Sequence, residues 1–351
     1  MRMPRTLLFT GCVNQPLSYA RKVSGKGIAS FFVDEATGAA TAGPVFTDIV
    51  NPTFIALSPD GSRLAAISET EDQPSDSISL FSVNAETGGL LLLGRQSTRG
   101  TVACHCAFDA TGSMIGAANY SAGDKPAGDA ITIHSIEGNR PGEALTAIAH
   151  AGHGPNQQRQ EHSHAHCVRW TPDHRFIAVA DLGIDRVRLY RADDFTLESE
   201  IALPPGSGPR HIVFHPTKPF AYLMAELQPA VTSFAYADGR LALLSTEPVQ
   251  PPVSGGSGIV IAPGATHLFV GDRGNAAVAR FDIGSDGIAR YAASTPSGGD
   301  VPRDLAFSRS GELLAVANVL GDVALFRHAP DGALSPLSHI ATGNPTAVAF
   351  L

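Results

Sequence analysis

Cysteine, tryptophan and long apolar runs are all scarce in this chain of 351 residues. Its four cysteines are Cys12, Cys104, Cys106 and Cys167, and no two of them have the C-x-x-C spacing. A chain of this length does not need a disulfide framework, so we expect reduced thiols in the core or at the rim of a pocket. The single tryptophan and the 7% of aromatic residues leave little material for an aromatic docking surface.

The chain also lacks a basic run, and its net charge is −8. This balance argues against nucleic acid as a partner. No apolar run approaches the roughly 20 residues of a membrane helix, so we expect no membrane partner. The stretch from Met1 to Cys12 ends like a bacterial lipoprotein cleavage site, but its apolar run is far shorter than the roughly 7–15 residues of a signal. We therefore expect a mature cytoplasmic protein.

Long helical periodicity is absent, and a pattern of short strands and turns repeats instead. One copy, Glu161 to Tyr190, shows three short strands around the turns Pro172-Asp173-His174 and Asp181-Leu182-Gly183. The first of these turns recurs at intervals of 44 to 62 residues, at Asp60, Thr111, Asp173, Thr217, Gly264 and Ser310. Repeats of roughly 40–50 residues with several short strands are typical of propeller blades.

A half copy at residues 345–351 brings the number of blades to seven. It has a first strand only, and the N-terminus offers the missing parts: a strand at Leu7 to Thr10 and an outer hairpin at residues 27–38. We predict an all-β, seven-bladed β-propeller that spans residues 1–351 as one domain, with both chain ends completing one blade so that no sheet edge remains. Residues 139–160 form the longest irregular stretch, and loops of that length are usually functional or mobile.

Alignment of the blades predicts two polar columns at one mouth of the central channel. The first column, at the start of each innermost strand, holds Thr53, Cys104, His166, Arg210, Ser257, Arg303 and Thr346. The second, at the end of each following strand, holds Glu69, Asn119, Asp181, Glu226, Asp272 and Asn318, and Arg273 comes next to Asp272. Strand-end Asp and Asn commonly bond turn backbones, and this interpretation is the stronger one for Asp181, Asp272 and Asn318. Arginines are costly to order at a crowded axis without an anion, so we favour function for Arg210, Glu226 and Arg273.

His162, His164 and His166 alternate along the chain, and on a strand they would share one face. Three imidazoles on one face could bind zinc or copper. Alternatively, only one or two of them enter the pocket and the rest lie in a loop, and a histidine that titrates near neutral pH serves as a general base. We favour the second interpretation and expect no metal and no cofactor.

Several stretches together resemble the seven-bladed propeller lactonase family, which includes bacterial 6-phosphogluconolactonases and fungal carboxymuconate-lactonizing enzymes. They are HSHAHCVRWTPDHRFIAVADLGIDRVRLYR, GSGPRHIVFHPTKPFAYLMAEL, HLFVGDRG and VPRDLAFSRSGELLAVAN, and the match runs in register from Leu7 to Leu351. The resemblance implies a metal-independent site whose catalytic residues fall on His166 (with His164 as the close alternative), Arg210, Glu226 and Arg273. One departure is that Ser163 and Ala165 precede the two histidines where the family usually has proline.

The resemblance implies a lactonase, most simply one that hydrolyses 6-phospho-D-glucono-1,5-lactone in the pentose phosphate pathway. Arg210 and Arg273 would stabilise the oxyanion, and His166 would take a proton from water. Substrate-binding positions are His164, Arg303, Asn119 and Glu69, with Arg303 facing the phosphate. Alternatives are a muconate-type cycloisomerase, another lactone hydrolase, or a non-catalytic propeller that binds proteins. The expected partner is a small anionic lactone, and the expected state is a monomer or weak homodimer.

Overall fold

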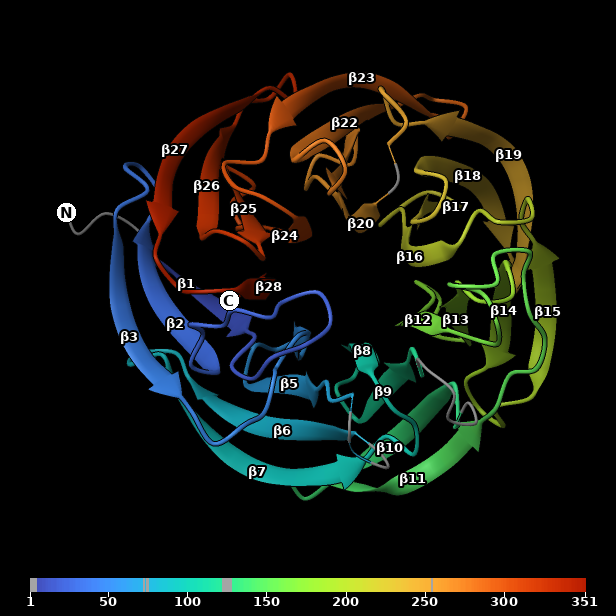
Figure 1. Ribbon diagram of the computed structural model, residues 1–351, viewed down its shortest axis with the longest axis horizontal. Helices are drawn as coiled ribbons and strands as arrows, with labels where there is room; N and C mark the ends of the chain where they lie inside the picture. The colour runs from blue at the N-terminus through green and yellow to red at the C-terminus, as the bar shows by residue number, and fades with distance from the viewer. Residues whose placement is uncertain (1–4, 72, 74–75, 122–127, 254) are drawn as a thin grey trace.

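The computed structural model describes residues 5–71, 73, 76–121, 128–253 and 255–351. Residues 1–4, which belong to the stretch weighed as an export signal, lie outside this set. Seven four-stranded antiparallel sheets surround a common axis (Figure 1). The predicted all-β, seven-bladed propeller is therefore confirmed. Among the described residues, no helix is long and apolar enough to cross a membrane.

Each blade has four strands that run from the axis to the rim. The innermost strands are β4 (Ile55–Leu57), β8 (Ala103–Phe108), β12 (Ala165–Trp170), β16 (Pro209–Phe214), β20 (Gly256–Ile261), β24 (Pro302–Phe307) and β28 (Pro345–Phe350). The second strands are β5 (Arg63–Ser68), β9 (Met114–Asn119), β13 (Phe176–Asp181), β17 (Phe220–Ala225), β21 (His267–Asp272), β25 (Leu313–Asn318) and β1 (Arg5–Cys12). The third strands are β6 (Ser77–Asn84), β10 (Ile131–Glu137), β14 (Arg186–Arg191), β18 (Ala230–Ala237), β22 (Ala277–Ile283), β26 (Val323–His328) and β2 (Ile28–Asp34). The outer strands are β7 (Gly89–Ser97), β11 (Arg140–Ile148), β15 (Leu197–Ala202), β19 (Arg240–Pro248), β23 (Ala289–Pro296), β27 (Leu334–Ile340) and β3 (Ala40–Phe46).

The two ends of the chain complete one blade, as the half copy predicts. Strand β28 pairs antiparallel with β1, with Thr10 opposite Val348, and the sheet order is β28-β1-β2-β3. The hydroxyl of Thr10 also donates to the carbonyl oxygen of Ala347 at 2.9 Å. In Figure 1 the red β28 lies beside the blue β1. This pairing closes the ring, because the last strand of the chain completes the sheet that the first three strands begin. The inner edge of β1 is therefore paired.

Burial explains why small and β-branched residues fill the second strands. Every residue of β13, FIAVAD, is buried, because both faces of this sheet pack against neighbouring blades. One such core joins Val187 and Leu189 of β14 to Leu223 and Phe234 of the next blade. The outer strands are partly exposed, and their apolar alternation is correspondingly weak.

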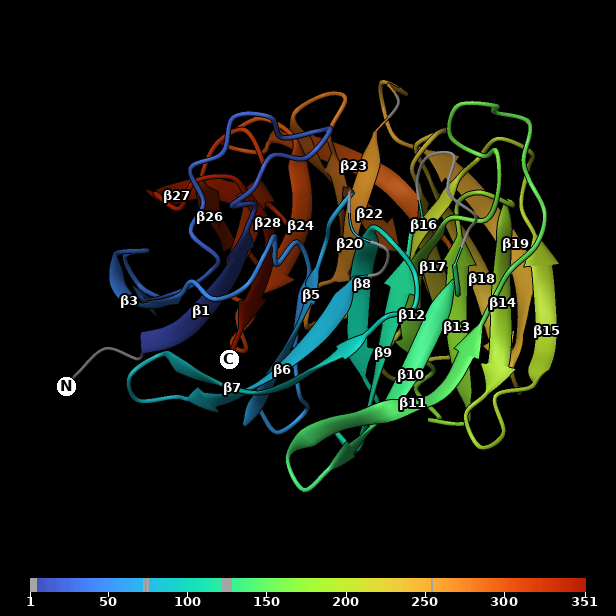
Figure 2. The ribbon, with the colours of Figure 1, turned by 60° about the horizontal axis from the view of Figure 1, so that its bottom comes forward.

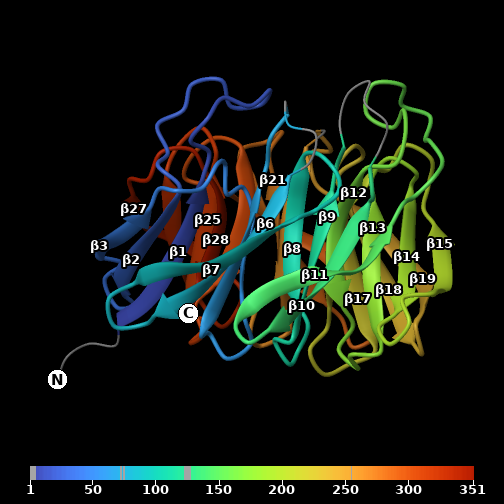
Figure 3. The same cartoon turned by 90° about the horizontal axis from the view of Figure 1, so that it is seen from below.

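The prediction that residues 139–160 are irregular throughout is wrong. Residues 140–148 form β11, which pairs with β10. Gly138 and Asn139 have φ of 50° and 73°, as a tight hairpin turn of the primed type requires. The strand escaped prediction because it is an outer strand whose exposed and half-buried positions do not alternate cleanly. The irregular loop is residues 149–164, and it rises from the same face of the ring as the loop of residues 13–27 (Figures 2 and 3).

Candidate active site

A cavity of about 470 Å³ opens at the mouth that these two loops frame. It is lined by Ser18, Tyr19, Glu69, Glu71, Val102, Cys104, Tyr120, Gln158, Arg159, Glu161, His166, Glu226, Arg273 and Arg303. Its size is that of a small-molecule site. Most of these side chains are polar or charged, so the cavity suits a hydrophilic ligand.

On one wall of the cavity, arginine side chains surround the carboxylate of Glu226, which lies directly after β17. Its Oε2 accepts a hydrogen bond from Nε of Arg210 at 3.1 Å and lies 2.9 Å from Nη2 of Arg273. Its Oε1 lies 2.5 Å from Nη2 of Arg159. Burial would raise the pKa of Glu226, but Arg273 and Arg210 hold it well below its usual range. Three guanidinium groups thus share one carboxylate, and the excess positive charge suits an anion or an oxyanion.

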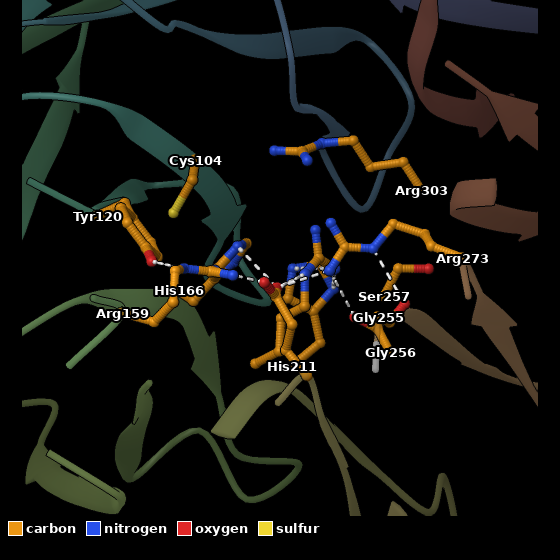
Figure 4. A network of polar contacts seen from close by, with 12 residues as sticks. Cys104, Tyr120, Arg159, His166, His211, Gly255, Gly256, Ser257, Arg273 and Arg303 are labelled. Atoms are coloured by element: carbon orange, nitrogen blue, oxygen red, sulfur yellow. Dashed lines mark hydrogen bonds and ion pairs between the residues drawn. The ribbon is translucent and has the colours of Figure 1, made fainter. Parts of the chain in front are cut away.

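Arg273, which follows β21, is held by backbone carbonyls (Figure 4). Its Nε donates to the oxygen of Gly255 and its Nη2 to the oxygen of Gly256, both at 3.0 Å. A Cβ at Gly256 would lie 2.2 Å from the carbonyl oxygen of Ala225. Only glycine therefore allows β20 to come this close to the segment that carries Glu226.

His166, on β12, lines the cavity beside Glu226, and Figure 4 shows its ring turned toward the guanidinium groups. Its Nε2 lies 4.0 Å from Oε2 of Glu226. Burial, and then the charge of Arg210, lower the pKa of His166 well below its usual range. The ring is therefore neutral at neutral pH, and the lowered pKa makes it a weaker proton acceptor than the histidine titrating near neutral pH that the sequence led us to expect.

The alternative in which His162, His164 and His166 share one face does not hold, because β12 begins only at Ala165, and the favoured interpretation, in which only some of the three enter the pocket, fits the structure. His162 and His164 lie in the preceding loop. The ring of His164 stacks on Tyr120 with 4.3 Å between centroids, and its Nδ1 lies 2.6 Å from the Tyr120 carbonyl oxygen. Unlike His166, His164 does not line the cavity. Of the two histidines weighed as catalytic, the structure thus places His166 at the cavity and His164 behind its wall.

The opposite wall is acidic. The guanidinium of Arg303 lies over the ring of Tyr19 at 4.3 Å, and its Nη2 is 3.9 Å from Oε2 of Glu69. The hydroxyl of Tyr19 donates to the same oxygen at 3.0 Å. Burial raises the pKa of Glu69, although Arg303 opposes this effect. With Glu71 also in the lining, this wall suits sugar hydroxyls better than an anion.

Two other predicted site residues lie outside the lining. Arg210 is only 2% exposed and lies beneath Glu226, so it supports that carboxylate from below. Asn119 donates from Nδ2 to the carbonyl oxygens of Thr98 and Asp129 at 2.8 and 2.7 Å, and its side chain fastens a loop. The structure therefore does not bring Asn119 to the cavity.

The turn-binding interpretation fits the remaining polar strand ends. Asp181 accepts hydrogen bonds from the backbone N–H groups of His164 and Gly183 at 2.8 and 3.0 Å. Asp272 and Asn318 likewise bond to groups of their own turns and of neighbouring loops. These three residues shape the mouth without lining it.

Sequence reasoning missed Arg159, Tyr120 and Tyr19, which lie on loops. Arg159 donates from Nε to the Tyr120 hydroxyl at 3.0 Å as well as reaching Glu226. Loop residues have no place in the blade periodicity, so alignment of the repeats cannot find them. The available signals were the predicted irregular stretch of residues 139–160, which contains Arg159, and the position of Arg159 just before the histidine-rich stretch.

A layer of aromatic rings forms the floor below the cavity. Phe54 and His105 stack at 4.2 Å, His105 meets His211 at 5.0 Å, and His211 meets His166 at 5.3 Å. Nη1 of Arg210 contacts the His211 ring at 3.3 Å. A second cavity, of about 710 Å³, opens on the other side of this layer and shares no lining residue with the first. The ring layer thus lies between the candidate site and the cavity at the opposite mouth.

A closed propeller with a charged pocket of this size at one mouth of its axis is suited to a small polar ligand. The family model described as "Lactonase, 7-bladed beta-propeller" matches residues 12–350, and the chain belongs to this family. A 6-phosphogluconolactonase of Bacillus subtilis is 28% identical over 345 residues, which cover 94% of this chain and 96% of that protein.

Solved structures show the same fold. A Bacteroides fragilis protein is 28% identical with a TM-score of 0.89, over 99% of this chain and 98% of that one. The periplasmic gluconolactonase PpgL of Pseudomonas aeruginosa is 24% identical with a TM-score of 0.89, over 99% of both chains, and at this identity the likeness concerns the fold alone.

Proposed function

We propose that this protein hydrolyses a sugar lactone in the cavity between the two loops. The observation that carries the proposal is the set of three guanidinium groups around Glu226, beside the neutral imidazole of His166. The likeness to a B. subtilis protein named 6-phosphogluconolactonase supports it. We retain a cytoplasmic location and a monomer or weak homodimer as predictions.

The arrangement suits attack of water on an ester carbonyl. With the lactone carbonyl beside Arg273, negative charge that develops on its oxygen meets a fixed guanidinium, backed by the charge of Arg210. His166 takes the proton from the attacking water and passes it to the ring oxygen as the C–O bond breaks. The product is the open-chain hydroxy acid. Glu226 holds the two arginines in position during these steps.

The substrate we propose is 6-phospho-D-glucono-1,5-lactone. Its phosphate carries negative charge, and the side chain of Arg159 is 42% exposed at the cavity rim, within reach of a group that points to solvent. The sequence favoured Arg303 for this role, but its side chain is only 11% exposed and faces Glu69 and Tyr19 inside the cavity. Arg303 and Glu69 are better suited to the ring hydroxyls.

The test is hydrolysis by EDTA-treated protein of fresh 6-phosphogluconolactone and of D-glucono-1,5-lactone, measured as acid release above the spontaneous rate. We expect faster turnover of the phosphorylated lactone, and a large loss in the His166→Gln variant. Turnover of the unphosphorylated lactone alone would refute the assignment of a phosphorylated substrate, but it would still support the proposed lactonase activity. Turnover of neither would contradict the proposal and direct the search to muconate-type substrates.

A further inference from the structure

Three side chains to which the proposed hydrolysis assigns no role meet at the rim of the cavity, and one of them, Glu161, lines it. The carboxylate of Glu161 and one ring nitrogen each of His162 and His164 all lie within 4.8 Å of one another. Nε2 of His164 is 3.3 Å from Oε2 of Glu161, and Nε2 of His162 is 3.7 Å from Oε1. Ligands around a tetrahedral zinc ion with bonds of about 2.0–2.1 Å are about 3.3–3.4 Å apart. The observed spacing is therefore close to that of a metal site.

The hydrogen bond of His164 leaves its other ring nitrogen, Nε2, for a metal. Nδ1 of His164 lies 2.6 Å from the Tyr120 carbonyl oxygen, which can only accept, so the proton is on Nδ1. Its Nε2 is buried and has no hydrogen-bond partner among the described residues, and the ring is 1% exposed. Nδ1 of His162 faces the carbonyl oxygen of Ser163 at 2.8 Å in the same way. Backbone carbonyls commonly fix metal-binding histidines in this tautomer.

The juxtaposition of His164 and Glu161 calls for a cation. A lone pair on Nε2 and a carboxylate oxygen 3.3 Å apart are both acceptors, and they repel each other unless a proton or a metal ion lies between them. Their position is also fixed by the fold. Asp181 holds the backbone N–H of His164 at 2.8 Å, and a Cβ at Gly183 would lie 1.9 Å from the His162 carbonyl oxygen.

We propose that Glu161, His162 and His164 bind one divalent transition-metal ion of the zinc class at the rim of the pocket. Two imidazoles and one carboxylate are ligands that zinc accepts, with water in the remaining position. The ion ties Glu161 to the start of β12 and so steadies the adjacent Arg159, two positions earlier in the loop. The sequence had suggested the three alternating histidines as a possible set; in the structure Glu161 takes the place of His166.

The test is zinc binding by tag-free, EDTA-treated and dialysed protein, followed by isothermal titration calorimetry and by the thermal unfolding midpoint. We expect one ion per chain and a higher midpoint with zinc, and no comparable effect of magnesium, which prefers oxygen ligands. Binding by His162→Gln and Glu161→Gln should be at least about tenfold weaker. These side chains are 23% and 34% exposed, so both variants should fold, which their metal-free midpoints will show.

His174→Gln, a change at an exposed histidine of the opposite mouth, is the matched control and should bind zinc as the wild type does. Zinc binding that the Glu161 and His162 variants leave unchanged would overturn the proposal. The absence of zinc binding would also overturn the proposal. Nitrogen NMR shifts that show a doubly protonated His164 at neutral pH would then explain the contact, because a proton would bridge His164 and Glu161.

Discussion

Nη2 of Arg159 lies 2.5 Å from Oε1 of Glu226, although 67 positions separate the two residues in the chain. Arg159 comes from the loop of residues 149–164, and Glu226 from the end of a second strand in a different blade. The contact therefore joins a loop to the centre of the pocket. It also supplies the third cation around Glu226 and places it where the cavity meets solvent.

Replacement of Arg159 by Ala should change selectivity more than catalysis. Loss of charge-assisted hydrogen bonds of about 1.5–3 kcal/mol lowers kcat/KM for the phosphorylated lactone about ten- to hundredfold. We expect a much smaller loss for D-glucono-1,5-lactone, in steady-state kinetics with both substrates. Arg175→Ala, at an exposed ion pair with Asp238, is the control. An equal loss for both lactones would show that Arg159 does not bind the phosphate.

Replacement of Glu226 by Gln should affect both turnover and stability. The change leaves Arg210, which is 2% exposed, without its anionic partner, and breaking such a buried pair costs about 3–5 kcal/mol. Urea denaturation measures this loss, and we expect kcat to fall at least about a hundredfold. Glu312→Gln, at an exposed pair with Arg327, should cost no more than about 1 kcal/mol. Unchanged kcat would remove Glu226 from the mechanism.

The stability of the protein should depend on pH through Asp304. Its Oδ2 accepts a hydrogen bond from the backbone N–H of Val348 at 3.0 Å, and burial raises its pKa to about 6. Because this pKa lies above that of the unfolded chain, the stability from the protonated carboxyl is complete below about pH 4 and is lost as the pH rises through about 6.

Asp304→Asn keeps an acceptor for Val348 without the charge. At pH 7.5 the variant should therefore unfold at a higher temperature than the wild type, with a gain in the free energy of unfolding of at most about 3 kcal/mol. This gain should be smaller at pH 4.5. Thermal unfolding at both values measures it. A gain that is the same at both would exclude titration of Asp304 as the cause.

The four cysteines should not react in the native protein. All are free and buried, as the sequence predicts, and burial raises the pKa of Cys12 to about 12 and that of Cys104 well above its usual range. We expect negligible labelling by a thiol reagent at pH 8 and four labelled thiols after unfolding. Fast labelling of Cys104, which lines the cavity, would instead show that the mouth opens further than in this structure.

Blade periodicity predicted the fold and one part of the site. A repeated turn identifies equivalent positions in every blade, and a closed ring brings equivalent positions to the same mouth. Glu69, His166, Glu226 and Arg303 were found in this way, and all four line the cavity. Arg273 was found because it follows such a position.

Periodicity could not predict what depends on loops or on side-chain direction. Arg159 reaches Glu226 only because the loop of residues 149–164 folds back over the mouth. Asn119 ends a second strand, as Asp181 and Asp272 do, but its side-chain amide donates to two backbone carbonyl groups and does not reach the cavity. His164 differs from His166 because the strand begins between them. The role thus depends on a tertiary contact for Arg159 and Asn119, and on the exact start of a strand for His164 and His166.

The ring layer of Phe54, His105 and His211 has a kinetic consequence. It lies between the candidate site and the cavity at the opposite mouth, so under the proposed function substrate and product use the same mouth in turn. A released sugar acid has the same hydroxyls as the lactone and adds a carboxylate that the arginines around Glu226 attract. Under the proposed function, accumulated product should therefore compete with incoming substrate, and turnover should depend on how quickly a following reaction removes the acid.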